Sequence, residues 1–457
     1  MNKVIRTIFD HMPSYGKDLI VSLYGSFRNS WRYNRDSAAL IEEAGLREEW
    51  SLSQWKIYQE NCLDKLLHRA YHHIPYYRNH WSKRRQKGDQ SSYTNLENWP
   101  VIDKQVVRSS TLAFLAESCN PKKMYHEHTG GTSGSPLNVY WSKETTLRYY
   151  AIFERRIRNW HGVSKDTRYG ILGGQMLIPF SRNKPPFWVR NLSMNQLYMS
   201  SYHIRKDSVA AYINAMNSFE IDYLFGYASS LYSIALLGLS QNLTFPSLRV
   251  VISNAEPLFD YQAELITKAF GCPVVNTYGM SELVAAACTS PTSNGFMELW
   301  PEVGFIENVT SIETERIVST GILNQDMGLI RYDVGDNGKF AYPSTGKIDY
   351  YKIQQLEGRN DDLVTTRDGR RIGRLDTVFK RDLGILEAQI VQEDIGTFTI
   401  YVVPDETYEK STSRILIESL KERVGKADVT VVPIEKIPRT RMGKFRAVIS
   451  KVQSHQE

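Results

Sequence analysis

The densest run of small and hydroxyl-bearing residues in the chain is HEHTGGTSGSPLNVYWS, residues 126–142. Its glycines let the backbone approach a ligand closely and turn N–H groups toward an anion, and its hydroxyls add further donors. Such a loop suits a polyphosphate, although the G-x-x-x-x-G-K-[ST] spacing of a P-loop is absent. A plain flexible loop is the alternative. The residues concerned are Thr129, Gly130, Gly131, Thr132, Ser133, Gly134 and Ser135.

Two further polar segments each follow a predicted strand. In parallel sheets, ligands bind beyond the carboxyl ends of the strands. Glu282, after a glycine turn, can hold Mg²⁺ beside phosphates, or it is a surface glutamate. Tyr278 can stack on a base or pack in the core. The two segments are SNAEP (Ser253, Asn254, Ala255, Glu256, Pro257) and TYGMSE, which contains Tyr278, Gly279, Met280, Ser281 and Glu282.

Three charged segments lie farther along the chain. GLIRYDVGD ends in Asp336, which can accept hydrogen bonds from ribose hydroxyls or simply form a turn. In GRNDD, Arg359 can hold a phosphate or sugar, or make local ion pairs with Asp361 and its neighbour. In IPRTRMGKFR, Lys444 can neutralise charge developing between a phosphate and a carboxylate, or belong to an ordinary basic tail.

The elements that position these segments follow from hydrophobic patterning. Between about residues 168 and 278, predicted strands and helices alternate, which indicates βαβ units and a largely parallel sheet. Short strands and turns follow to about residue 357. The predicted strands are 168–173, 222–225, 248–253, 273–278, 304–309, 315–320, 328–333 and 349–354, and the helices of the alternating part are 208–219, 228–239 and 258–270.

The two ends of the chain have different patterns. The first 120 residues are mostly helical, with an amphipathic helix from Leu52 to Ala70 and a helix stop at Pro75. A helix is also predicted over 144–160. The last hundred residues predict a strand at 397–403, a helix at 411–424 and a strand at 429–434, which together form a small α+β domain.

The predicted fold class is therefore a large α/β N-terminal domain with a β-rich portion, followed by a small α+β domain. Its parts are a helical segment of the large domain (1–120), the ligand-binding core (121–357), a short polar boundary (358–362) and the small C-terminal domain (363–457).

Composition excludes several classes of protein. The 457 residues carry 56 Lys and Arg against 50 Asp and Glu, and no run of like charges concentrates the net charge of +6, which argues against a nucleic-acid partner. The four cysteines are scattered without a CxxC pair, so neither a zinc site nor a disulfide framework is indicated. No signal peptide and no apolar run of membrane-spanning length is present, and a cytoplasmic protein is expected.

Taken together and in this order, the segments resemble the adenylate-forming superfamily of acyl-CoA synthetases, amino-acid adenylation domains and luciferases. Within it, the chain is most similar to the phenylacetate–CoA ligase-like branch and its CapK-type proteins of capsule and surface-polysaccharide clusters. The resemblance covers nearly the whole chain and includes LLHRAYHHIPYYR, LENWPVIDKQVVR and IGRLDTVFKRDLGILEAQIVQ.

The resemblance implies the adenylate-forming enzyme fold, with a small mobile domain, and a two-step reaction. A carboxylic acid attacks the α-phosphate of ATP, giving an acyl-adenylate and pyrophosphate, and a thiol, amine or sugar then takes the acyl group. ATP and Mg²⁺ are implied, as is CoA where its thiol is the acceptor. The acid and the acceptor are not identified. Two alternatives stay open: a nucleotidyl transferase that stops at an adenylylated product, as related coenzyme synthetases do, and a non-catalytic scaffold in polysaccharide assembly.

The resemblance also implies roles for the candidate residues. The loop from Thr129 to Pro136, with Thr132 as a catalytic residue, grips the β- and γ-phosphates. The strip from Ser253 to Pro257 lies beside adenine, and Tyr278 stacks on it. The remaining roles are Mg²⁺ ligand for Glu282, ribose ligand for Asp336, ribose and phosphate ligand for Arg359, hinge for Asp361 and catalytic lysine for Lys444. The sequence departs from the family at Ser135, where a lysine is usual, so a cation near the pyrophosphate is missing.

Two regions keep open interpretations. An acyl pocket can be lined by residues after the strand at 222–225, or these residues can be core packing; they are His203, Tyr223, Phe225, Gly226 and Tyr227. Residues 1–34 mix apolar side chains with lysine and arginine, which fits either an interfacial helix in peripheral contact with a membrane or a helix docked on the protein core.

Overall fold

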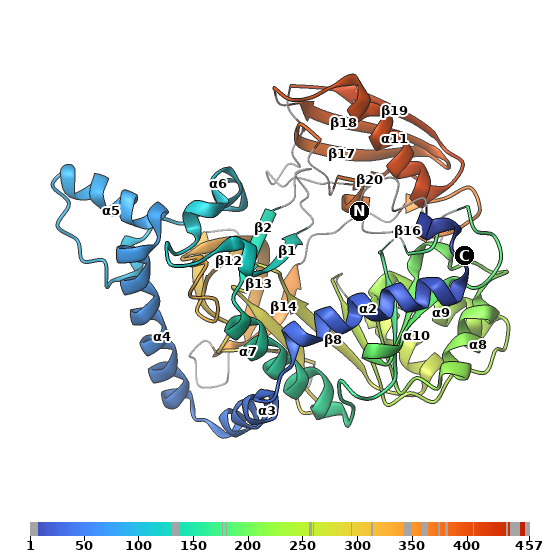
Figure 1. Cartoon of the computed structure of the whole chain (residues 1–457), viewed down its shortest axis with the longest axis horizontal. Coiled ribbons are helices and arrows are strands. Elements are labelled where there is room, and N and C mark those ends of the chain that lie inside the picture. The colour runs from blue at the N-terminus through green and yellow to red at the C-terminus, as the bar shows by residue number, and fades with distance from the viewer. Residues whose placement is uncertain are drawn as a thin grey trace.

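The fold is that of a computed structural model (Figure 1). It describes residues 8–129, 137–175, 177–179, 181–255, 258, 260–293, 295–311, 314–341, 349–357, 364–372, 375–379, 383–404, 406–435, 437–438 and 448–452.

The N-terminal part is helical, as predicted. The helix expected from Leu52 to Ala70 is three residues longer and begins with a capping box, in which the side chains of Ser51 and Gln54 each bond the other's backbone N–H. Pro75 does not only end this helix; it is the first residue of the next one, a position where its missing N–H costs nothing. The helices are α2 Ser14–Arg32, α3 Ser37–Leu46, α4 Leu52–His73, α5 Pro75–Gln86 and α6 Lys104–Ser109.

A twelve-stranded sheet forms the centre of the large domain, in the order β11-β12-β13-β14-β10-β9-β8-β7-β6-β3-β5-β4. Strands β3, β5, β6, β7 and β8 run parallel to one another, which confirms the predicted βαβ part, and α8, α9 and α10 make crossovers. The elements are β3 Tyr169–Gly173, β4 Trp188–Asn191, β5 Gln196–Ser200, α8 Val209–Phe219, β6 Tyr223–Tyr227, α9 Ala228–Ser240, β7 Val250–Asn254, α10 Asp260–Phe270 and β8 Val274–Gly279.

The second half of the sheet is antiparallel and is joined to the first through β8, which pairs with β7 on one side and β9 on the other. The strand predicted at 328–333 starts too early in the chain. Arg331 has a φ of 50°, outside the strand region, and β13 begins only after it. The strands are β9 Ala286–Thr289, β10 Met297–Leu299, β11 Gly304–Ser311, β12 Thr314–Gly321, β13 Tyr332–Ala341 and β14 Asp349–Glu357.

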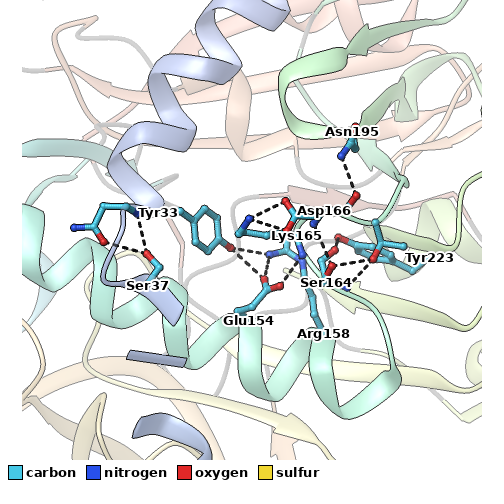
Figure 2. A network of polar contacts seen from close by, with 11 residues as sticks. Tyr33, Ser37, Glu154, Arg158, Ser164, Lys165, Asp166, Asn195 and Tyr223 are labelled. Atoms are coloured by element: carbon cyan, nitrogen blue, oxygen red, sulfur yellow. Dashed lines mark hydrogen bonds and ion pairs between the residues drawn. The ribbon is translucent and has the colours of Figure 1, made fainter. Parts of the chain in front are cut away.

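A hairpin and a helix precede the parallel sheet. β1 Tyr125–Thr129 pairs with β2 Leu137–Trp141, and α7 Lys143–Phe153 follows. The helix predicted over 144–160 changes at Glu154 into a π-turn, Glu154–Arg158. There the Arg158 guanidinium donates to the Glu154 carboxylate over 2.7 Å and to the Tyr33 hydroxyl over 2.9 Å, a buried network shown in Figure 2.

The C-terminal part carries a separate four-stranded sheet, in the order β19-β18-β17-β20, covered by one helix (Figure 1). It touches the large domain where the Arg370 guanidinium donates to the Tyr202 carbonyl oxygen. The elements are β15 Val364–Thr365, β16 Arg371–Ile372, β17 Ile385–Asp394, β18 Thr397–Pro404, α11 Lys410–Val424, β19 Asp428–Pro433 and β20 Val448–Ser450.

Among the described helices, none has the length and apolar character needed to cross a bilayer. The four cysteines are free thiols. Burial raises the pKa of Cys272 to about 11 and that of Cys288 to about 12, so both stay protonated at neutral pH.

Candidate active site

The candidate site lies at the carboxyl ends of β7 and β8, where the sheet changes from parallel to antiparallel. Ser253 and Asn254 are the last residues of β7, and Tyr278 and Gly279 are the last of β8. The two strand ends are tied together because the Thr277 hydroxyl donates to the Ser253 carbonyl oxygen over 2.8 Å. The two polar segments that the sequence placed after strands therefore lie side by side.

Tyr278 and Asp336 meet across the sheet, although 58 residues separate them in the chain. The Tyr278 hydroxyl donates to Asp336 Oδ2 over 3.0 Å, and both side chains are half-buried. A hydrogen bond to a carboxylate is stronger than one between neutral groups, so it orients the carboxylate. The structure thus brings the candidate base-stacking residue together with the candidate ribose ligand.

Glu282 is buried, with 7% of its surface exposed, and two other segments converge on it. The Tyr332 hydroxyl donates to Glu282 Oε1 over 3.2 Å, and Lys104 Nζ lies 3.7 Å from the same oxygen. Lys104 is the first residue of α6, which Asp103 caps by accepting from the Val106 backbone N–H over 2.9 Å. Lys104 therefore places a positive charge beside the buried carboxylate.

Sequence reasoning missed Lys104 and Tyr332 as members of this site. Lys104 follows a good N-cap residue and lies within LENWPVIDKQVVR, which carried part of the family resemblance, but nothing in its local pattern links it to Glu282. Tyr332 directly follows Arg331 and was counted as part of a strand.

Tight packing fixes the segment that carries Glu282. Trp141 Nε1 donates to the Ser281 carbonyl oxygen over 2.9 Å, so the β1–β2 hairpin is tied to this segment. Gly304 lies so close that an added Cβ would be 1.6 Å from the Val284 carbonyl oxygen. The Ser319 hydroxyl donates to that same oxygen. The backbone is therefore held from β2 just before Glu282 and from β11 and β12 just after it.

Unusual backbone conformations mark the same place. Three residues of types poorly suited to the left-handed region adopt it: Ala255 with φ 61°, Leu283 with φ 52° and Arg331 with φ 50°. They directly follow Asn254, directly follow Glu282 and directly precede Tyr332. Such strain costs of order 1–3 kcal/mol per residue and gathers at functional sites.

Two buried polar atoms at the end of β7 have no hydrogen-bond partner among the residues that the structure describes: Ser253 Oγ and Asn254 Oδ1. Ser253 is completely buried. Buried polar groups in native proteins are nearly always satisfied, so orphaned ones point to a missing ligand or water. A hydroxyl and an amide oxygen at this edge fit the polar edge of a nucleotide base, which is the ligand expected beside residues 253–257.

The carboxylate arrangement also fits Mg²⁺. The described residues contain no group of three or more His, Cys, Asp and Glu placed to hold a metal ion. Mg²⁺ in nucleotide sites is commonly held by one or two carboxylates together with substrate phosphates. Glu282 alone can supply that contribution.

The candidate acyl-pocket residues divide into two sets. Tyr223 and Phe225 face an aromatic core: Tyr223 stacks on Tyr169 with centroids 4.9 Å apart, and Phe225 stacks on Phe153 at 5.9 Å. Both ring nitrogens of His203 are hydrogen-bonded, Nδ1 to the Ser200 hydroxyl over 2.8 Å and Nε2 to the Pro179 carbonyl over 3.1 Å. These contacts are those of packing residues.

Tyr227, at the end of β6, lies differently. Its hydroxyl lies 3.0 Å from where a Cβ on Gly174 would stand, and the Tyr202 hydroxyl lies 3.2 Å from the same point. Tyr202 donates to the Gly174 carbonyl over 2.9 Å. Gly226, which directly precedes Tyr227 in β6, packs against Leu231 and Leu172 and has no room for a side chain. Tyrosines therefore gather on the glycines that end β3, a grouping that the sequence did not reveal.

Several candidate residues lie outside the described part of the chain, and their roles stay predictions. Thr129 is described only as the end of β1. The others are Gly130, Gly131, Thr132, Ser133, Gly134, Ser135, Pro136, Glu256, Pro257, Arg359, Asp361 and Lys444.

The chain is similar to proteins of known family. Residues 364–451 match the family of the CapK C-terminal domain. The chain is 26% identical over 459 residues to Protein CapK of Staphylococcus aureus, covering 98% of this chain and all of that protein. It is 22% identical over 340 residues to phenylacetate-coenzyme A ligase of Escherichia coli K12, covering 70% of this chain and 74% of the relative.

A solved structure has the same fold. It is 2-hydroxyisobutyryl-CoA ligase in complex with 2-HIB-AMP and CoA, which superposes with a TM-score of 0.54 at 16% identity and covers 88% of this chain and 91% of that one. The predicted fold class, a large α/β domain with a small C-terminal domain, is confirmed.

Proposed function

We propose that the chain, which is similar to Protein CapK over its full length and has the fold of an acyl-CoA ligase, activates a carboxylic acid with ATP and passes the acyl group to an acceptor. The observation that carries the proposal is the hydrogen bond between Tyr278 and Asp336, near the unsatisfied polar atoms of Ser253 and Asn254. Glu282 follows Tyr278 by four residues in the chain. These residues come from three different strands and one loop. A nucleotide suits them, because its base fits Ser253, Asn254 and Tyr278, its ribose fits Asp336, and its phosphates with Mg²⁺ fit Glu282.

In the first step, a carboxylate oxygen of the acid attacks the α-phosphorus of ATP, the bond from that phosphorus to the bridging oxygen breaks, and pyrophosphate leaves. Asp336 orients the ribose through its hydroxyls, and Tyr278 holds Asp336 in place. Glu282 would hold Mg²⁺, and the bound ion would neutralise part of the phosphate charge. Lys444 meets the α-phosphate and the acid's carboxylate and stabilises the charge that moves between them.

Lys104 adds a cation that the phosphate loop lacks. The loop carries Ser135 where a lysine is usual in the family, and Lys104 Nζ lies 3.7 Å from Glu282 Oε1. A lysine at this position can neutralise phosphate charge at the site where Glu282 acts. The departure at Ser135 therefore leaves the site with a positive charge from α6.

In the second step, a nucleophile attacks the acyl carbon, its proton is lost, and AMP leaves with one oxygen of the original acid. We propose a thiol, amine or sugar as the acceptor, with CoA as the first to test because a solved neighbour binds it. The name of the S. aureus relative favours a role in surface or capsular polysaccharide biosynthesis.

A panel of carboxylic acids with ATP and Mg²⁺ tests the proposal. We expect pyrophosphate and acyl-AMP with at least one acid, detected by a pyrophosphate assay and by mass spectrometry. Lys444→Ala should remove this activity and keep ATP binding. Lys451→Ala is the matched control, because Lys451 pairs with Glu393 in the same domain and outside the site. Release of ADP and phosphate, or a lack of ATP binding in calorimetry, would overturn the proposal.

A further inference from the structure

The helix α2 combines a docked face with an apolar face exposed to solvent. On the docked side, Asp18 Oδ1 accepts from the Arg190 backbone N–H over 2.8 Å, and Ser22 Oγ accepts from the Leu192 N–H over 3.0 Å. Gly25 lies against the Asn191 side chain, with no room for a Cβ. The helix is thus fixed along the edge strand β4 and runs across the large domain in plain view in Figure 1.

The opposite side of α2 forms a continuous apolar stripe. Its residues recur at helical spacing over twelve positions, about 18 Å along the axis. Tyr15 is 78% exposed and Leu23 is 65% exposed. No exposed residue of α2 carries a formal charge; the others are serines. The stripe consists of Tyr15, Leu19, Ile20, Leu23, Tyr24 and Phe27, and the exposed Ile8 and Leu192 lie next to it in the chain and across the β4 contact.

Such a surface is unusual on a protein that stays in water. The exposed face of a helix is normally polar, and a contiguous apolar patch rimmed by polar groups marks an interaction site. Docking on the core, one of the two interpretations of residues 1–34, accounts for only one side of the helix. It leaves the stripe unexplained.

Charge identifies the occupant of the stripe. Residues 1–34 hold five cations and two carboxylates, half of the net charge of the whole chain. Of the five cations, Lys3 and Arg6 precede α2 in the chain, whereas Lys17 is buried and Arg28 pairs with Glu127 over 2.7 Å. Beside the stripe, Arg190 is exposed on β4. Of the two carboxylates, Asp18 is half-buried against β4. An apolar stripe of leucine, isoleucine and aromatic side chains flanked by cations is the pattern of helices that lie in the interface of an anionic membrane.

We propose that the α2 stripe docks the protein on the surface of a bilayer that contains anionic lipids, with the helix axis in the membrane plane. The leucine, isoleucine and phenylalanine side chains enter the boundary of the acyl chains, and the tyrosines lie at headgroup depth. Arg190 meets lipid phosphates. Because the other face of α2 is fixed to β4, the large domain is held on the membrane in one orientation.

Vesicle sedimentation of the full-length protein tests this. We expect binding to phosphatidylcholine vesicles that contain phosphatidylglycerol, weaker binding to phosphatidylcholine alone, and further weakening in high salt. The double variant Leu19→Gln/Leu23→Gln should lower the partition coefficient at least tenfold. Arg190→Glu should lower it several-fold on the anionic vesicles only.

A matched control is available on α4. Leu52 and Ile57 are exposed to 65% and 59%, similar to the stripe leucines, and the Leu52→Gln/Ile57→Gln variant should bind vesicles like the unmodified protein. Thermal melting of each variant separates lost binding from lost fold.

Three outcomes would overturn the proposal. They are a lack of vesicle binding by the unmodified protein, equal binding by the stripe variant, and concentration-dependent self-association that the stripe variant alone loses, which would make a second copy the occupant. Sedimentation needs no catalytic turnover, so its result is separate from that of the proposed function.

Discussion

Tyr278→Phe removes one hydroxyl and probes the centre of the proposed nucleotide site. In the structure that hydroxyl donates to Asp336 Oδ2 over 3.0 Å. Hydrogen bonds to charged groups contribute about 1.5–3 kcal/mol, and the lower part of this range suits a half-buried pair. If Tyr278 holds Asp336 for the ribose, losing about 1.5 kcal/mol weakens ATP binding slightly more than tenfold. The phenyl ring remains, so stacking on the base is preserved.

The assay is calorimetry of ATP binding, with thermal melting to confirm the fold. Tyr33→Phe is the matched control, because the Tyr33 hydroxyl also contacts a carboxylate, Glu154 Oε2, over 3.3 Å, but in the network of Figure 2, away from the strand ends of β7 and β8. We expect it to change stability and leave ATP affinity within about twofold.

A double-mutant cycle makes the test sharper. Asp336→Asn should weaken ATP binding, and Tyr278→Phe added to it should have little further effect, because the hydroxyl acts through the carboxylate. Two results would refute the reasoning: wild-type ATP affinity in a folded Tyr278→Phe protein, or strictly additive effects of the two substitutions.

Three further predictions concern the stability of the fold. Lys104→Met should lower the free energy of unfolding by about 2 kcal/mol in chemical denaturation, because it leaves the buried Glu282 carboxylate without its cation. Glu282→Gln in that background should restore part of the loss, and no loss in Lys104→Met would mean that the pair does not stabilise the fold. Gly304→Ala should lower it by about 1–3 kcal/mol because its Cβ would collide with the Val284 carbonyl, whereas Gly279→Ala, whose Cβ would lie 3.9 Å from Ala286, should cost less than about 1 kcal/mol; equal costs would contradict the packing argument. Burial lowers the pKa of His161 below 6.5, so as the pH drops the unfolded chain binds the proton before the folded one does. The free energy of unfolding therefore falls as the pH drops below 6.5, with a slope of at most about 1.4 kcal/mol per pH unit. His161→Gln should flatten that fall, and an unchanged slope would show that His161 does not cause it.

Local pattern was sufficient for the parallel part of the fold. Runs such as VVIS and PVVNTY have the β-branched composition of buried strands, and the amphipathic segments between them form α8, α9 and α10. The pair β4 and β5 was missed because each strand is short, and β5 begins at the polar Gln196, whose side chain is buried against Tyr169. The start of β13 was misplaced because nothing in the residue type of Arg331 announces a positive φ.

The site could be predicted in its parts but not in its contacts. Ser253, Tyr278 and Glu282 were singled out because each lies at or just after the end of a predicted strand in a parallel sheet, where ligands bind. The pairing of Tyr278 with Asp336 depends on the order β13-β14-β10-β9-β8, which no local pattern specifies. The approach of Lys104 to Glu282 likewise depends on where α6 packs.

The central claim is that an oxygen of the acid forms a bond to the α-phosphorus of ATP. The most direct measurement supplies an accepted acid whose carboxylate carries a heavy-oxygen label, runs the complete reaction with an acceptor, and weighs the AMP by mass spectrometry. We expect one labelled oxygen in each AMP. Unlabelled AMP, or label in inorganic phosphate instead, would contradict it.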